Sequence, residues 1–335
     1  MQNDSPSGAA PDRILVTGAT GFVGGALARA LAARGVAPRL LVRANSDPTN
    51  IAQIPGERVV GDLTDPASLA RAVAGCRQVF HVAADYRIWV PDPAAMLRAN
   101  VDGSAALVRA AQAADVERIV YCSSVAALGL TGTDHPADET TPVDESRIVG
   151  TYKLSKFRAE QAVLALARQG APVVVVNPSM PIGPGDVKPT PTGRLIRDAA
   201  RGKIPAFVDT GMNVVHVDDV AEGHLLAMQR GRIGSKYILG GDNLDLRALL
   251  ALIAEQAGRR PPRISLPRGP LFPLAAVAEL YGRISGHEPL LTLDALRMSR
   301  KKMFFSSDLA RAELGYAPRP VHEAIRDALA WFAHR

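Results

Sequence analysis

Short apolar runs alternate with longer segments of helical periodicity through the first half of the chain. Apolar runs that predict β-strands occupy residues 13–17, 39–42, 58–60, 78–82, 118–122 and 173–176. Segments with helical periodicity lie among them, at residues 22–34, 93–113 and 152–169. The last apolar run is four consecutive valines, which is typical of a strand buried on both faces. Strands that alternate with helices of this length predict an α/β fold with a doubly wound parallel sheet and right-handed crossovers.

The pattern changes after Asn177. Prolines and glycines become frequent, and shorter helices are predicted near residues 218–229, 246–257, 271–284 and 321–332. We therefore predict that residues 13–177, with returning segments at about 213–240, form the main domain, and that residues 178–335 mainly form a smaller C-terminal α/β domain that holds the substrate. The apolar segment 271–284 is interpreted as an ordinary core helix. The alternatives for it are a pocket wall, a dimer face or a membrane contact.

The composition is that of a globular protein, because 47% of the 335 residues are apolar and 21% are charged. The formal net charge is +6, but Lys and Arg are scattered, so no nucleic-acid partner is predicted. Two cysteines, Cys76 and Cys122, fit a reducing cytoplasm better than a disulfide framework.

The spacing of His216 and His224 is not that of a metal site, and no metal is predicted. Residues 1–12 are expected to be a disordered tail, and no window reaches the roughly 20 apolar residues of a membrane span, so we expect a soluble cytoplasmic protein.

A glycine-rich turn joins the first predicted strand to the first predicted helix. Gly18, Gly21 and Gly24 permit a tight turn, a close backbone approach to a pyrophosphate, and close packing of the helix on the sheet. The helix start adds free N–H groups and a positive dipole end, both suited to phosphate. This context favours a Rossmann-type dinucleotide site over a purely structural turn. The predicted cofactor-binding residues of the turn are Gly18, Thr20, Gly21, Phe22, Val23 and Gly24.

Arg43 and Asp62 follow the second and third predicted strands. NAD-binding Rossmann folds usually present an acidic residue at the end of the second strand, whereas an arginine suits the 2′-phosphate of NADP. The sequence therefore favours NADP, with NAD as the alternative; an ordinary exposed arginine is the structural interpretation. Asp62 is placed to accept a hydrogen bond from the adenine amino group. It is also close to the helix predicted near Pro66, although Asp65 is better placed to cap that helix.

Tyr152 and Lys156 are four residues apart and therefore lie on one face of a predicted helix. An ammonium at this position is expected to lower the phenol pKa, so that Tyr152 exchanges a proton with a substrate hydroxyl or ketone. Ser124 follows the fifth predicted strand, at the edge where open α/β sheets bind ligands, and is placed to orient the substrate oxygen. Each feature alone is common. Their order along the chain favours a catalytic site composed of Ser124, Tyr152 and Lys156.

A larger set of motifs gives the chain a family resemblance. From about Arg13 to the C-terminus, it resembles the extended short-chain dehydrogenases. The motifs are the turn at 17–24, Gly61-Asp62, His81-Val82-Ala83-Ala84, Asn100-Val101-Asp102-Gly103, Ser123-Ser124, the Tyr152/Lys156 pair, Asn177-Pro178, His216-Val217-Asp218-Asp219 and Leu314-Gly315-Tyr316-Ala317-Pro318. Within that family, it is most similar to bacterial hopanoid-associated sugar epimerases and to the dihydroflavonol reductase-like group. The stretches HVAADYRIWVPDP (81–93), NPSMPIGPGDVKPTPT (177–192) and RKKMFFS (300–306) carry this narrower resemblance.

The resemblance implies roles for further residues. Asn100 would support a proton relay; an asparagine that binds backbone groups is the structural alternative. The helices that carry Asn100 and Tyr152 would form a homodimer interface. Residues that would line the nicotinamide and its ribose are Ala83, Ala84, Asn177, Pro178 and Ser179, and further cofactor contacts would be Leu63, Ser123, Tyr152 and Lys156.

Two reactions share the hydride transfer that these residues imply. The resemblance favours a redox-neutral sugar epimerase associated with hopanoid biosynthesis, and the alternative is an NADPH-dependent ketone or aldehyde reductase. In nucleotide-sugar epimerases, an arginine four residues before the His of the His-Val-x-Asp segment commonly binds the diphosphate. Met212 occupies that position here, so a sugar-like or lipid-linked substrate other than a UDP-sugar stays open. A non-catalytic NADP sensor is a distant third interpretation, because the serine, tyrosine and lysine are all present.

Overall fold

A seven-stranded parallel sheet forms the centre of the protein. In this computed structural model, the described residues are 13–87, 90, 92–132, 135–285 and 291–334. The predicted tail at residues 1–12 lies outside them. The strand order is β3-β2-β1-β4-β5-β6-β10. The strands are β1 Arg13–Thr17, β2 Arg39–Val42, β3 Arg58–Val60, β4 Cys76–His81, β5 Arg118–Cys122, β6 Val173–Pro178 and β10 Lys236–Leu239. The order reverses between β1 and β4, which confirms the predicted doubly wound Rossmann fold.

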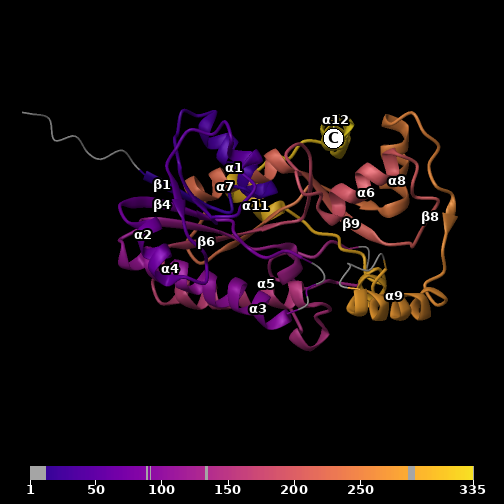
Figure 1. Ribbon diagram of the computed structural model, residues 1–335, viewed down its shortest axis with the longest axis horizontal. Coiled ribbons are helices and arrows are strands. Elements are labelled where there is room, and N and C mark those ends of the chain that lie inside the picture. Colours follow the sequence, from indigo (N-terminus) through magenta and orange to yellow (C-terminus); the bar gives the residue numbers. More distant parts are fainter. Residues whose placement is uncertain (1–12, 88–89, 91, 133–134, 286–290, 335) are drawn as a thin grey trace, which may run out of the picture.

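Helices cover both faces of this sheet (Figure 1). One face carries α1 (Phe22–Ala32) and α7 (Val217–Arg230), and the other carries α2 (Pro66–Val73), α4 (Gly103–Ala113) and α5 (Thr151–Arg168). The four valines of β6 explain why both faces are filled. Val174 and Val176 pack toward α1 and α7, whereas Val173 and Val175 pack toward α4 and α5, and all four are fully buried.

The predicted long helix at 93–113 is divided by a π-helical segment. α3 (Pro93–Leu97) runs into the π-helical residues Arg98–Asp102 and then into α4. Asn100 lies within the wide turn and is buried. Such single-turn π segments occur often at functional sites.

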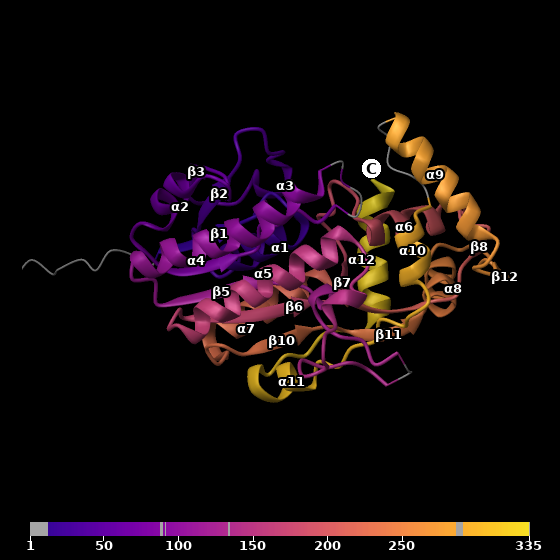
Figure 2. The same cartoon turned by 90° about the horizontal axis from the view of Figure 1, so that it is seen from below.

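A second, three-stranded sheet has the order β11-β9-β7, formed by β7 (Met180–Ile182), β9 (Gly211–His216) and β11 (Asp242–Asp245). Its helices are α6 (Pro191–Ala200), α8 (Leu246–Gln256) and α12 (Val321–Ala333), which share an apolar cluster with β9 (Figure 2). The remaining elements are β8 (Ala206–Phe207), β12 (Ile264–Ser265), α9 (Leu271–Ser285), α10 (Leu293–Met298), α11 (Asp308–Leu314) and the 3-10 turns Thr49–Ile51, Val125–Ala127 and Glu145–Arg147.

Helix α9 corrects one sequence interpretation. It is not a core helix, because the side chains of Leu274, Val277, Leu280 and Tyr281 are each at least 60% exposed. Apolar composition alone misled the prediction, since only the opposite face of α9 contacts the rest of the chain. None of the helices within the described residues is both long and apolar enough to cross a membrane.

Candidate active site

The glycine turn is built as tightly as the sequence predicts. Gly18 has φ +73°, and a Cβ atom there would lie 2.7 Å from the backbone nitrogen of Ala83. A Cβ on Gly24 would lie 2.2 Å from the carbonyl oxygen of Gly18. Gly21 is the N-cap of α1 and provides no side-chain cap, so the chain's own side chains do not cap the N–H groups of the first turn. The turn residues Gly18, Thr20, Gly21, Phe22, Val23 and Gly24 thus form one strand–turn–helix unit of the kind that binds phosphate.

Asn50 holds this turn from outside and was not identified from the sequence. Its side-chain amide lies 3.2 Å from the carbonyl oxygens of both Thr20 and Gly21, to which it donates. It lies in the 3-10 turn after β2, where no local pattern reveals a contact 30 residues back in the chain. The contact fixes the backbone of the turn.

A buried hydrogen-bond chain connects the ends of β1 and β4. The backbone N–H groups of Val82 and Ala83 donate to the Thr17 hydroxyl oxygen, at 3.1 Å each. Thr17 therefore donates its own proton to His81 Nδ1, 3.0 Å away, and His81 Nε2 donates to Ser104 at 2.9 Å. Burial lowers the pKa of His81 to about 3, so the ring is neutral, and its hydrogen bonds are those of a structural residue.

Arg43 and Asp62 lie at the edge of the same site. Arg43 is exposed at the end of β2, and its charge contributes to lowering the pKa of Asp62 and of Asp85. The main cause at Asp62 is its hydrogen bonds from the hydroxyl and backbone N–H of Thr64, at 2.7 and 2.9 Å. Asp65 caps α2, as the sequence indicated.

The remaining residues predicted near the cofactor are distributed over neighbouring strand ends. Leu63 packs against Gly103 at the start of α4, whose Cβ would lie 2.8 Å from the Leu63 Cβ. Ala83 and Ala84 follow β4 and are half-buried. Ser123 follows β5 and is buried.

Ser124, Tyr152 and Lys156 come together at the carboxyl end of β5. The Ser124 hydroxyl oxygen accepts the N–H of Ala126 at 3.1 Å, and the hydroxyl is also hydrogen-bonded to the phenol of Tyr152. Lys156 is buried, and its Nζ donates to the carbonyl oxygen of Cys122 at 2.8 Å.

The acidity of Tyr152 differs from the sequence expectation. Burial raises the pKa of Tyr152 to about 12, and the hydrogen bond with Ser124 only partly opposes this. Burial likewise lowers the pKa of Lys156, whose ammonium is directed to the Cys122 carbonyl. Desolvation is therefore the largest influence on the phenol pKa. Sequence spacing could not show this, because it does not report burial.

Glu160 lies behind Ser124 and Asn177 and was not identified from the sequence. Its carboxylate is fully buried, accepts a 2.6 Å hydrogen bond from Asn177 and lies 3.7 Å from the ammonium of Lys236. Burial raises the Glu160 pKa, and hydrogen bonds and Lys236 oppose the shift. Asn177 also donates to the carbonyl oxygen of Ser124 at 3.0 Å. Glu160 therefore orients the amide that holds the Ser124 backbone. The available signal was spacing, since Tyr152, Lys156 and Glu160 repeat every four residues.

Asn100 binds backbone groups and a hydroxyl. Its amide oxygen accepts the Asp85 N–H at 2.7 Å, and its amide nitrogen donates to the Asp85 carbonyl at 2.8 Å and to Ser155 at 2.9 Å. Ser155 in turn donates to the carbonyl oxygen of Tyr152 at 2.8 Å. This geometry matches the structural alternative and fixes the start of α5.

Two buried polar atoms at the end of β6 fit a nicotinamide. The amide oxygen of Asn177 and the hydroxyl of Ser179 have no hydrogen-bond partner among the described residues. Such atoms are costly when left unpaired, and a carboxamide or ribose at this strand end would pair with them. Pro178 lies between them and ends β6. Together with the glycine turn, the residues present fit a nicotinamide dinucleotide. No cluster of metal-binding side chains occurs in the part of the chain that the structure describes.

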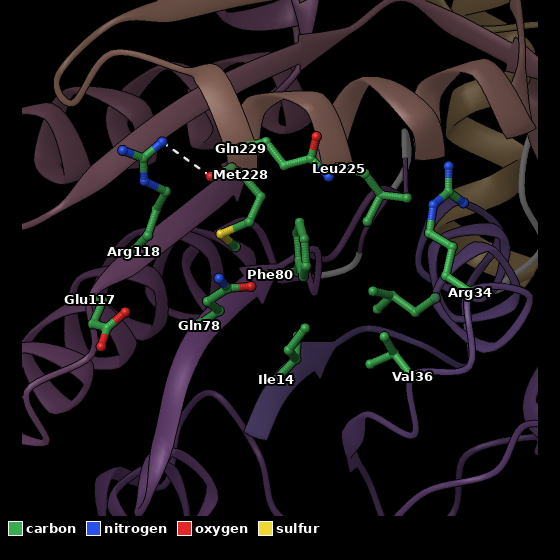
Figure 3. A pocket seen from close by; sticks show the side chains of 11 residues that line it. Ile14, Arg34, Val36, Gln78, Phe80, Glu117, Arg118, Leu225, Met228 and Gln229 are labelled. Carbon is green, nitrogen blue, oxygen red and sulfur yellow. Dashed lines mark hydrogen bonds between the residues drawn. The ribbon is translucent and has the colours of Figure 1, made fainter. Parts of the chain in front are cut away.

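A cavity of about 550 Å³ lies at the opposite edge of the sheet (Figure 3). Its lining includes Ile14, Gln78 and Arg118, near the starts of β1, β4 and β5, and Arg118 donates to the Met228 carbonyl at 3.1 Å. Open α/β sheets bind ligands at the carboxyl ends of their strands. This cavity is therefore separate from the candidate active site.

The chain is similar to known proteins over almost its full length. A "Putative dihydroflavonol 4-reductase" of Synechocystis sp. is 43% identical over 325 residues, which cover 96% of this chain and 94% of that protein. The "4-hydroxy-2-methyl-3-oxo-4-farnesyl-3,4-dihydroquinoline-1-oxide ketoreductase" of Stigmatella aurantiaca is 34% identical and covers 95% of both chains. The crystal structure of gox2253 superposes with a TM-score of 0.87 at 58% identity, covering 96% of this chain and 98% of that one.

The family model described as "NAD dependent epimerase/dehydratase family" matches residues 14–240. These residues contain the glycine turn, Ser124, Tyr152, Lys156 and the strands that bring them together. The chain therefore belongs to the NAD dependent epimerase/dehydratase family and is an NAD(P)-dependent oxidoreductase of the extended short-chain dehydrogenase type.

Proposed function

We propose that this protein is an NADPH-dependent carbonyl reductase in which Tyr152 is the proton donor. The observation that carries the proposal is the phenol of Tyr152, which is hydrogen-bonded to Ser124 and whose pKa is raised to about 12. A phenol with this pKa holds its proton at neutral pH and is ready to protonate a carbonyl oxygen that receives a hydride.

Each catalytic side chain has a defined task in this reaction. A bound NADPH supplies the hydride. Ser124 and Tyr152 donate hydrogen bonds to the substrate oxygen, and the Tyr152 proton is transferred to that oxygen. Lys156, held by the Cys122 carbonyl, supplies positive charge beside the phenolate that forms. Asn177 and Glu160 keep the Ser124 backbone in place.

Reduction is favoured over sugar epimerisation by Met212. This side chain is buried in the apolar cluster of the second sheet, so this position supplies no cation for a sugar-nucleotide diphosphate. The names of the relatives from Synechocystis sp. and Stigmatella aurantiaca, both reductases, support the same direction. The epimerase linked to hopanoid biosynthesis thus becomes the second candidate. The homodimer and the assignment of residues 178–335 to the substrate stay predictions.

The test is turnover with ketone and aldehyde substrates in the presence of NADPH or NADH. Tyr152→Phe should lower kcat at least about 100-fold and leave the Kd for NADPH unchanged, because only the proton donor is lost. Tyr316→Phe is the matched control, since the Tyr316 hydroxyl is buried and has no hydrogen-bond partner among the described residues. Full turnover by Tyr152→Phe would contradict the assignment. A tightly held NAD that survives purification, with sugar converted and no net consumption of NADPH, would establish the epimerase instead.

A further inference from the structure

Exposed apolar side chains gather at one end of the molecule. Among the described residues, nine large apolar side chains are exposed, and six of them lie between Ile264 and Tyr281. Four of the six are on α9, where Leu274 is 61%, Val277 67%, Leu280 60% and Tyr281 67% exposed. Figures 1 and 2 both place α9 at the periphery, at the end of the molecule opposite α2. An apolar surface of this kind usually marks an interaction site.

The exposed positions form one continuous face of α9. At 100° per residue, Leu274, Val277, Leu280 and Tyr281 fall within one side of the helix, which we call the α9 apolar face. The opposite side, with Ala275 and Gly282, is buried against the protein. Glu279 accepts the backbone N–H of Leu293 at 2.8 Å and so fixes α9 to α10. The α9 apolar face therefore remains open while the helix is held in place.

The net positive charge of the chain comes from the stretch of sequence that contains this helix. Residues 257–303 contain nine Lys and Arg but three Asp and Glu, and this excess of six equals the formal net charge of the whole chain, +6. The exposed side chains that make no ion pair with another described residue include Arg259, Arg260, Arg263 and Lys301. The guanidinium of Arg300 lies over the ring of Phe272, 5.1 Å from its centroid, at the start of α9.

We propose that the α9 apolar face and its flanking cations dock this protein on an anionic membrane surface. A 15-residue helix with a single apolar face suits shallow insertion at the headgroup boundary, since no described helix can span a bilayer. Charge complementarity favours a membrane over a second copy of this chain as the partner of this face. Anionic lipid attracts the cations beside α9, whereas a second copy of this chain would bring two positively charged ends together.

The docking surface is structurally continuous with the candidate active site. α9 is fixed to α10 through Glu279, and Asp294 of α10 lies beside Gly150, where a Cβ would be 3.5 Å from its carboxylate. Gly150 directly precedes α5, which carries Tyr152. A protein docked through α9 would thus hold the start of α5 close to the lipid surface. The docking itself does not depend on which reaction is catalysed.

Co-sedimentation with vesicles tests the proposal on the full chain. Vesicles of phosphatidylcholine alone are compared with vesicles that contain roughly one third phosphatidylglycerol. We expect binding to the anionic vesicles, weakened by salt. Leu274→Ser/Val277→Ser should weaken this binding at least about tenfold, because two apolar side chains no longer enter the lipid. The control is Val60→Ser/Ile233→Ser, two side chains that are 59% and 53% exposed at other places and should have no effect.

A second pair of variants tests the charges. Arg260→Glu/Arg263→Glu should weaken binding to anionic vesicles at least about tenfold. Arg13→Glu/Arg71→Glu changes the net charge equally, in β1 and α2, and should bind like the wild type. Unchanged NADPH binding by all four variants shows that they are folded. Absence of wild-type binding, or equal binding by the Leu274→Ser/Val277→Ser variant, would overturn the proposal. So would a wild-type dimer that this variant converts to monomer, because the face would then bind protein.

Discussion

Arg43 is the residue on which we propose that the choice of cofactor depends. Its guanidinium is exposed beside Asp62 and Asp85, so its charge is available to a phosphate at the end of β2. We predict that Arg43→Asp weakens NADPH binding by about 10- to 100-fold, because a charge-assisted contact is lost and a like charge is gained. NADH binding should be unchanged or stronger. Fluorescence titration of both nucleotides measures this, with Arg71→Asp on α2 as the control. An equal effect on both nucleotides would show that Arg43 does not recognise the 2′-phosphate.

Asn177 joins the candidate catalytic serine to the buried carboxylate of Glu160. In Asn177→Asp, the donor to both partners is lost and two carboxyl groups share one buried place. We predict that the free energy of unfolding falls by about 2–4 kcal/mol, as for other disrupted buried polar networks. The sharing raises the pKa of the carboxyl groups in the folded state, so the deficit should be larger at pH 8 than at pH 5. Urea unfolding at both pH values measures it, and Asn45→Asp at an exposed position is the control.

Among the secondary-structure elements, the glycine turn sets how closely strand β1 and helix α1 approach each other. Gly24→Ala would place a Cβ 2.2 Å from the Gly18 carbonyl oxygen, so the helix must move away from the strand. We expect at least about tenfold weaker NADPH binding together with a lower Tm, since the N–H groups of α1 move with the helix. Gly269→Ala has open space and should be neutral in both measurements. Wild-type affinity in Gly24→Ala would show that the turn tolerates a wider spacing.

The elements of the main sheet were predictable because their chemistry is local. Four predicted strands, at 13–17, 39–42, 58–60 and 118–122, match the observed bounds, since each is a short, mainly apolar run. The second sheet was not predicted. β7 and β11 are short, and the pairing of all three strands depends on contacts distant in sequence. Helix α6 had a usable signal, Thr190 as cap followed by Pro191, within a stretch interpreted as irregular.

The candidate site also has a part that the sequence predicts and a part that it does not. The glycine turn and the Ser124, Tyr152 and Lys156 positions follow from motif and spacing, although their roles stay predictions. Asn50, Glu160 and the raised pKa of Tyr152 depend on burial and on contacts between distant segments. The π-helical segment around Asn100 could not be predicted either, because one extra residue in a helical turn does not measurably change the spacing of apolar residues.

Two buried neutral histidines tie the stability of the whole molecule to pH. Burial lowers the pKa of His81 to about 3 and that of His224 to about 4. The unfolded chain binds protons at both sites below about pH 6.5, and the folded chain does not, so stability is lost as the pH falls. We predict a loss of about 2 kcal/mol for each histidine between pH 7 and pH 5.

Urea unfolding from pH 7 to pH 5 checks this dependence. His224→Asn keeps a donor for the Val220 carbonyl and should remove about half of the loss. His322→Asn at an exposed position should leave the whole loss in place. A pH dependence equal to wild type in His224→Asn would show that this ring does not titrate as the structure implies.

The uneven placement of charge has a further consequence for how the protein behaves in separations. Outside residues 257–303, the acidic and basic side chains balance, so the isoelectric point near 9.5 is a property of one short stretch of sequence. The molecule is therefore an electric dipole, and a cation exchanger should retain it by the end that carries α9. Its elution by salt would then report on substitutions in that stretch rather than on total charge, and two variants of equal net charge should separate on the column.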